Sequence, residues 1–192
     1  MNRPNKGFTL MELLIVIGVL GILAAGLLAA IDPFEQLKKA RDTNNRSATI
    51  EMLSALTRYY ANHGAFPWNM TTPLAVCNRD GGALSELGAL GDSAVSVQSV
   101  DLTNCLEATL IEDGELKDTY FDGIGETDIY VASDPDDVTD IVVCFSPEGK
   151  ASRSDPTTKY LFTAGNPVTQ GVIEENAACP DVDEPNCLQC YQ

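Results

Sequence analysis

The chain has 192 residues, enough for one domain with an additional segment, and its formal net charge at pH 7 is −16. The charge is unevenly distributed: residues 1–46 carry six Lys/Arg and four Asp/Glu, whereas residues 47–192 carry six Lys/Arg and twenty-four Asp/Glu. So acidic a surface repels phosphate backbones, which disfavours a partner nucleic acid bound through a basic face. With His63 as the single histidine and no nucleophile–base pair, phosphate loop or zinc-hydrolase motif, we expect no enzyme.

The first element that we expect is a membrane-spanning helix over residues 8–31, which read FTLMELLIVIGVLGILAAGLLAAI. After Glu12 the run contains no charged residue. A helix of this length extends about 36 Å, enough to cross a hydrocarbon core of about 30 Å. Arg3 and Lys6 precede the run, so we expect a single-pass cytoplasmic membrane protein with a cytoplasmic N-terminus and an exported head.

Three interpretations of this apolar run compete. A cleaved secretory signal could use residues 28–30 (Leu-Ala-Ala) as its small-residue site, but the run is overlong and carries a carboxylate near its start. A plain transmembrane anchor explains the length and the flanking charges, although it does not explain Glu12. The third interpretation accounts for Glu12 and for the residues before it.

Residues 6–14, KGFTLMELL, resemble the prepilin motif of type IV pilins and pseudopilins. The resemblance implies that a prepilin peptidase removes residues 1–7 as a leader by cutting between Gly7 and Phe8. The new amino group of Phe8 is then methylated. It also implies a structural subunit of a type IV pilus-like or type II secretion-like filament. Its partners would be membrane lipid, like subunits and assembly-platform membrane proteins, and the mature filament would be periplasmic or at the cell surface.

In this family the Glu at the position of Glu12 is taken to pair with the amine of Phe8 on a neighbouring subunit. An ion pair in a low-dielectric bundle would fix axial register, because a slipped helix leaves both charges uncompensated. Alternatively, Glu12 lies close enough to the start of the run to reach the lipid headgroups. A membrane-tethered surface binding protein that does not polymerise therefore remains the alternative function.

Residues 32–63 are expected to continue as an amphipathic helix. Asp32-Pro33 predicts either a kink or a new start, with Asp32 as N-cap and Pro33 at the first helical position. The helix should end at residues 62–64, with Gly64 as a left-handed cap and His63 interacting with the helix dipole. Its apolar row consists of Ala48, Met52, Ala55 and Tyr59.

Residues 64–192 are expected to form an acidic, disulfide-containing globular head with a loop-rich tail from residue 164. Residues 101–117 predict one helix or two short ones. Strands are predicted at residues 129–132, 140–145 and 159–163, separated by turn-forming residues. The predicted fold is α+β, with a small antiparallel sheet packed on the C-terminal half of the long helix.

Six cysteines in the exported part predict disulfides in an oxidising compartment, and they are Cys77, Cys105, Cys144, Cys179, Cys187 and Cys190. Of the fifteen possible pairings, we expect Cys77 with Cys105, Cys144 with Cys179, and Cys187 with Cys190.

The acidic turn at Asp134, Asp136 and Asp137 is a weak candidate for a calcium site. It does not match an EF-hand loop, and solvated acidic turns are common. We expect no cofactor otherwise.

Overall fold

A computed structural model describes residues 7–30, 32–70, 74–78, 84, 87–88, 93–124, 129–134, 137, 139–164, 170–181 and 186–192. The chain divides into two compact units, Met1–Leu37 and Lys38–Gln192. Each unit is described by itself.

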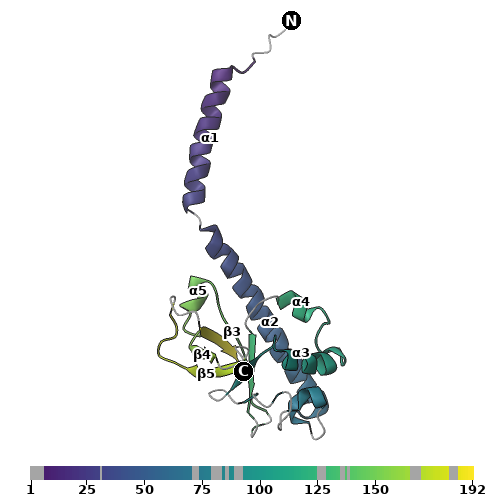
Figure 1. Ribbon diagram of the computed structural model, residues 1–192. Helices are drawn as coiled ribbons and strands as arrows, with labels where there is room; N and C mark the ends of the chain where they lie inside the picture. Colours follow the sequence, from purple (N-terminus) through teal and green to yellow (C-terminus); the bar gives the residue numbers. More distant parts are fainter. Residues whose placement is uncertain are drawn as a thin grey trace. The chain divides into compact units, whose positions relative to one another are not determined.

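The first unit contains α1, Leu10–Ala30 (Figure 1). Residues Leu10–Leu28 have a mean hydropathy of 2.5, and by length and composition they could cross a membrane. The large apolar side chains of this stretch are 47–83% exposed, and they surround the helix rather than forming one stripe. A helix that is apolar on all sides normally lies in a membrane or in the core of a larger assembly.

The helix α2, Pro33–His63, begins with the N-cap that was one of the two alternatives at Asp32. Asp32 Oδ1 accepts hydrogen bonds from the backbone N–H groups of Phe34, at 3.1 Å, and Glu35, at 3.3 Å. Pro33 lies at the first helical position, where its missing N–H costs nothing. The prediction of a new helix start at this point is therefore confirmed.

The predicted end of α2 is also confirmed. Gly64 has a φ of +77°, and its N–H donates to the carbonyl of Tyr60 at 2.7 Å. The His63 ring stacks on Tyr59 with 4.1 Å between centroids, and its Nε2 lies 3.4 Å from the carboxylate of Asp113. His63 therefore has structural contacts at the helix end, as expected.

The second unit contains a closed antiparallel barrel with the strand order β1-β2-β3-β6-β4-β5. Its strands are β1 (Ala94–Ser96), β2 (Ile129–Ser133), β3 (Ile141–Phe145), β4 (Tyr160–Ala164), β5 (Gln170–Glu175) and β6 (Cys187–Tyr191). The pairing of β1 with β5 closes the barrel. The predicted α+β class with an antiparallel sheet is confirmed, and the sheet closes into a six-stranded barrel.

The strands β2, β3 and β4 correspond to the three predicted strands, whereas β1, β5 and β6 were not predicted. The tail, expected to be loop-rich, supplies β5 and β6. β6 lies between β3 and β4 and pairs with both, so β3 and β4, which are consecutive among the predicted strands, are not neighbours. The tail thus contributes two of the strands of the barrel.

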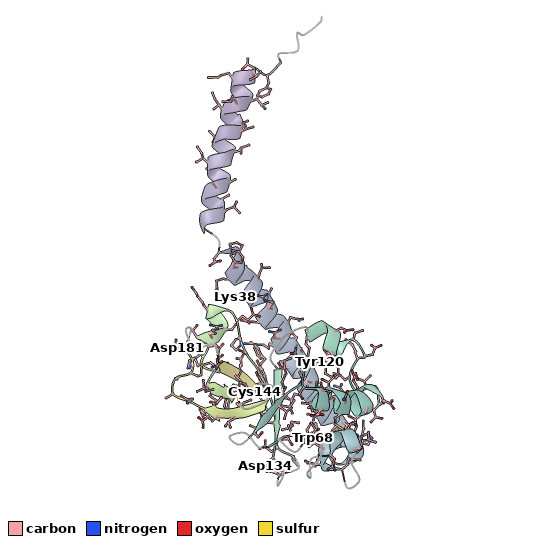
Figure 2. All side chains as sticks on the ribbon, in the orientation of Figure 1. Lys38, Trp68, Tyr120, Asp134, Cys144 and Asp181 are labelled. Carbon is pink, nitrogen blue, oxygen red and sulfur yellow. A yellow bond between two sulfur atoms is a disulfide. The ribbon has the colours of Figure 1, made fainter. Side chains whose placement is uncertain are left out.

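The second unit also contains several short helices among the residues that the structure describes. The predicted helical region begins as α3, Val100–Leu106, and continues as a π-helical turn, Glu107–Ile111. The other elements are η1 (Pro67–Asn69), η2 (Ala75–Cys77), α4 (Tyr120–Ile124) and α5 (Lys150–Arg153). Tyr120 of α4 reaches α2, where its hydroxyl donates to the carbonyl of Ala48 at 2.9 Å (Figure 2). Burial raises the pKa of this hydroxyl, so it remains a donor at physiological pH.

The core lies on both faces of the sheet. The predicted α2 row is buried and packs against Val95, Ile129, Val131, Ile141, Val143 and Phe145 of the strands, and against α3 and α4. The opposite face of the strands encloses a second cluster, formed by Ala94, Tyr130, Ala132, Val142, Cys144, Phe162, Ile173 and Leu188. Alternation along β2 and β3 therefore sends successive side chains into two different apolar environments.

Candidate processing and assembly segment

The segment before α1 is open to solvent. A Cβ placed on Gly7 would meet no atom within 4 Å, and Phe8 is 84% exposed. Within the part of the chain that the structure describes, the peptide bond between them is therefore not covered by folded protein. This accessibility is what proteolytic cleavage at this bond would need.

Glu12 and Thr9 form a capping box at the start of α1. Glu12 Oε2 accepts hydrogen bonds from the backbone N–H of Thr9, at 2.9 Å, and from its hydroxyl, at 2.8 Å. The Thr9 hydroxyl oxygen in turn accepts from the backbone N–H of Glu12 at 3.2 Å. This reciprocal arrangement satisfies donors that a helix start leaves without intrahelical partners.

Sequence reasoning missed this role of Thr9, although its signal is readable. A Ser or Thr followed three residues later by Glu, directly before an apolar run, is the sequence pattern of a capping box. Thr9 and Glu12 match it. The carboxylate has about four acceptor positions, so the bonds from Thr9 leave capacity for a further donor, such as an amine.

The head contains three disulfides, and one of the three expected pairings is correct. Cys77 joins Cys105, as predicted. The other two bridges are Cys144–Cys190 and Cys179–Cys187, in place of the expected Cys144–Cys179 and Cys187–Cys190.

The correction follows from β6 being a strand. Cys187 and Cys190 both lie in it, and three residues of strand span about 10 Å, beyond the roughly 7 Å that a disulfide can bridge between Cα atoms. Cys144 of β3 lies directly opposite Cys190 in the ladder, with their Cα atoms 4.0 Å apart. The tail is therefore fastened to β3 through Cys190 instead of Cys179.

The structure gives little support to the calcium candidate. Asp136 lies outside the described residues. Asp137 Oδ1 accepts from the hydroxyl and backbone N–H of Thr139, which lowers its pKa, and Asp134 Oδ1 accepts from the N–H of Asp137 at 3.3 Å. Over the described ranges, no group of three or more His, Cys, Asp or Glu side chains could hold a metal ion.

Comparison with known proteins finds similarity to a family motif in the N-terminal segment and to curated pilin proteins over 72 residues. The family described as the prokaryotic N-terminal methylation motif matches residues 2–28. Over 72 residues the chain is 43% identical to a fimbrial protein of Neisseria meningitidis serogroup B. The aligned residues make up 38% of this chain and 41% of that protein. It is also 43% identical over 72 residues to the type IV major pilin protein PilE1 of Neisseria gonorrhoeae, covering 38% and 42%.

The chain thus spans about two fifths of the length of these curated relatives. No solved structure matches it significantly. The N-terminal segment matches the methylation motif and the chain is similar over 72 residues to type IV pilins, as its resemblance to the prepilin motif predicted.

Proposed function

We propose that the chain is a structural subunit, either a pilin or a pseudopilin, of a type IV pilus-like or type II secretion-like filament. The methylation motif at residues 2–28, leading into a helix that is exposed and apolar on every side, carries this proposal. Such a helix needs a lipid environment or a bundle of like helices. A filament subunit uses both in succession.

Before assembly, α1 would hold the subunit in the cytoplasmic membrane. The basic residues Arg3 and Lys6 favour a cytoplasmic N-terminus. With α1 in that orientation, the second unit lies on the other side of the membrane. The three disulfides of that unit suit an oxidising compartment outside the cytoplasm.

Prepilin peptidase would then cut between Gly7 and Phe8, and Phe8 would be methylated. Thr9 and Glu12 both remain after this cut, so the capping box survives in the mature chain. The new α-amine is largely charged at neutral pH, and a positive charge at a helix N-terminus is unfavourable. Glu12 supplies the compensating carboxylate one helical turn away.

In the filament we assign Glu12 a second bond, to the Phe8 amine of a neighbouring subunit. A pair between subunits inside an apolar bundle fixes axial register, since any slip leaves two charges uncompensated. Other partners would be the assembly-platform membrane proteins, which extract the subunit from lipid.

The test combines the mass of the mature N-terminus with fractionation of whole cells. A methylated Phe8 start, with the chain present in sheared surface material beside its membrane pool, is the expected result. A mature chain starting at Ile31 would assign it to ordinary secretion, and an intact Met1 start to a plain anchor. A processed chain that never leaves the membrane fraction would support the tethered binding protein.

A further inference from the structure

An open cavity of about 190 Å³ lies between α2 and the segment of α5 in the second unit. Its lining consists of Lys39, Asp42, Thr43 and Arg46 of α2, with Ser152 of α5. Lys39, Thr43 and Arg46 follow one another at helical spacings of four and three residues, so their side chains share one face of α2. Two cationic side chains, two hydroxyl-bearing side chains and one Asp therefore line the same cavity.

Asp42 joins the two sides of the cavity, because its carboxylate connects α2 to the chain before α5. This carboxylate is buried, with 4% exposure, and it accepts from the backbone N–H of Glu148 at 2.7 Å and of Gly149 at 3.0 Å. The carboxylate is thus hydrogen-bonded to the chain before α5, and it forms part of the cavity lining beside Lys39 and Arg46. Glu148 in turn pairs with Arg41 at 2.7 Å.

Arg46 is also held in place. Its guanidinium donates to Gln189 Oε1 of β6 at 2.8 Å, and Gln189 is buried and donates to Thr157. A guanidinium has five N–H donors, so this bond leaves others for a ligand. Lys39 makes no hydrogen bond or ion pair through its ammonium with any residue that the structure describes.

The surroundings of the cavity are basic in a chain that is otherwise acidic. Residues 38–46 and 147–155 contain six of the twelve Lys/Arg but only three of the twenty-eight Asp/Glu. Lys38 lies beside α5 at one end of the second unit, whereas the acidic turn at Asp134 lies at the other end (Figure 2). An anion would be attracted to the first end and repelled from the second.

We propose that this cavity binds a phosphate group, and that the phosphate is the headgroup of an anionic phospholipid in the membrane that stores the chain. Lys39 and Arg46 would supply charge-assisted hydrogen bonds, and the hydroxyl of Ser152 would add a further donor. The Thr43 hydroxyl already donates to the carbonyl of Lys39 at 2.9 Å, so it lines the cavity without donating to the phosphate. Lys39 follows Leu28, the end of the apolar stretch, by eleven residues, a length of chain over which the cavity could reach the headgroups. Basic groups close to a spanning helix are attracted to anionic lipids.

This inference rests on the proposed membrane storage of the chain. A bound headgroup would hold the basic end of the second unit against the membrane until assembly extracts the subunit. The lipid is favoured over a free anion because α1 keeps the chain at a surface where headgroup phosphates are concentrated.

The full chain, reconstituted at one copy per lipid nanodisc, provides the test. Co-elution with the discs reports membrane insertion and so checks the proposed function separately. Acetylation of Lys39 by uncharged acetic anhydride is then followed by peptide mass spectrometry in discs of phosphatidylcholine and in discs containing phosphatidylglycerol. Lys117, 79% exposed on another face, is the internal reference.

We expect Lys39 to react about five-fold more slowly in the anionic discs than Lys117 does. Arg46→Gln should remove that protection, whereas the matched control Arg58→Gln, which lies outside the cavity and keeps the Lys117 reference, should leave it. Equal protection by inorganic phosphate in neutral discs would overturn the lipid assignment in favour of a free-anion site. A parallel set of neutral discs is loaded with several chains each, and protection seen only in that set would assign the cavity to the acidic surface of a second copy. Unchanged reactivity of Lys39, or protection that survives Arg46→Gln, would overturn the site itself.

Discussion

Thr9 and Glu12 bind each other at the start of α1, with the Glu12 carboxylate 2.9 Å from the Thr9 nitrogen and 2.8 Å from its hydroxyl. Glu12 therefore has a structural role in its own chain as well as the proposed role between subunits. The two roles require different properties of the side chain, because a cap needs an acceptor and an ion pair needs a charge. They can be separated by substitution.

Replacing Glu12 with Gln should keep the cap but abolish filament assembly. Gln is accepted at this position of a capping box, so α1 should insert in the membrane and be processed normally. The Phe8 amine of the neighbouring subunit would lose its charged partner, at a cost of roughly 3–5 kcal/mol in a buried pair. Immunoblots of sheared and membrane fractions should show a full membrane pool and an empty sheared fraction.

Glu12→Ala and Thr9→Val serve as the matched comparisons. Thr9→Val removes part of the cap, worth about 1 kcal/mol, while it keeps the charge of Glu12, so assembly should be reduced rather than abolished. Wild-type filament yield from Glu12→Gln, combined with a failure of Glu12→Ala, would show that capping alone explains this residue.

A bulky residue in place of Gly7 should block maturation. In the processing of the type IV pilins that this segment resembles, the residue before the cut must be small. Among the residues that the structure describes, no atom lies within 4 Å of a Cβ placed on Gly7, so Gly7→Leu should not disturb the fold. We expect a full-length chain, starting at Met1, to accumulate in the membrane fraction. Intact-mass measurement checks this, and a mature chain that still starts at Phe8 would contradict the cleavage assignment.

The parts of the fold that local pattern determines were predictable from the sequence. The helix α2 shows its apolar row, its Asp32-Pro33 start and its Gly64 end. The strands β2 and β3 are compact apolar runs between turns. These features depend on residues close together in the chain, and single-sequence reasoning can detect them.

The missed strands depend on distant partners. β6 reads CLQCY, with no apolar alternation, and its position between β3 and β4 is set by residues more than twenty positions away. β1 has only three residues. Cysteine spacing likewise does not determine pairing, because Cys144 meets Cys190 only after β6 has joined β3. In the candidate site the Thr9 cap was the readable signal that sequence reasoning overlooked.

The two disulfides of the tail should contribute unequally to stability. Cys144–Cys190 closes a 46-residue separation and Cys179–Cys187 one of 8, and chain-entropy arguments assign about 4 and about 2.5 kcal/mol to loops of these lengths. Replacing both members of each pair with Ser should therefore destabilise the head more in the first case. Urea unfolding followed by the fluorescence of Trp68, the single tryptophan and 3% exposed, provides the readout.

Alkylation of the exported native chain supplies a companion measurement. Since the described cysteines are all paired, we expect no thiol to react before reduction. A larger destabilisation from the Cys179/Cys187 replacement than from the Cys144/Cys190 replacement would show that strain or residual unfolded structure outweighs loop length.

A side chain at Gly149 should destabilise the second unit because it would collide with the carboxylate of Asp42. Its φ of −78° and ψ of 141° suit any residue, so the backbone itself imposes no requirement for glycine. A Cβ would, however, lie 2.9 Å from Asp42 Oδ2, the oxygen that accepts the Gly149 N–H. Gly149→Ala should therefore displace the carboxylate and weaken its bonds to the segment before α5, which costs about 1–3 kcal/mol for a buried group.

Gly123 of α4 provides the matched control, because a Cβ there meets no atom within 4 Å and Gly→Ala in a helix is neutral or favourable. Both variants are unfolded in urea with Trp68 fluorescence as the signal. A double-mutant cycle identifies the cause: in an Asp42→Ala background the clash is absent, so Gly149→Ala should cost much less than in the wild-type chain. Equal costs in the two backgrounds would mean that Asp42 is not the group that requires glycine at this position.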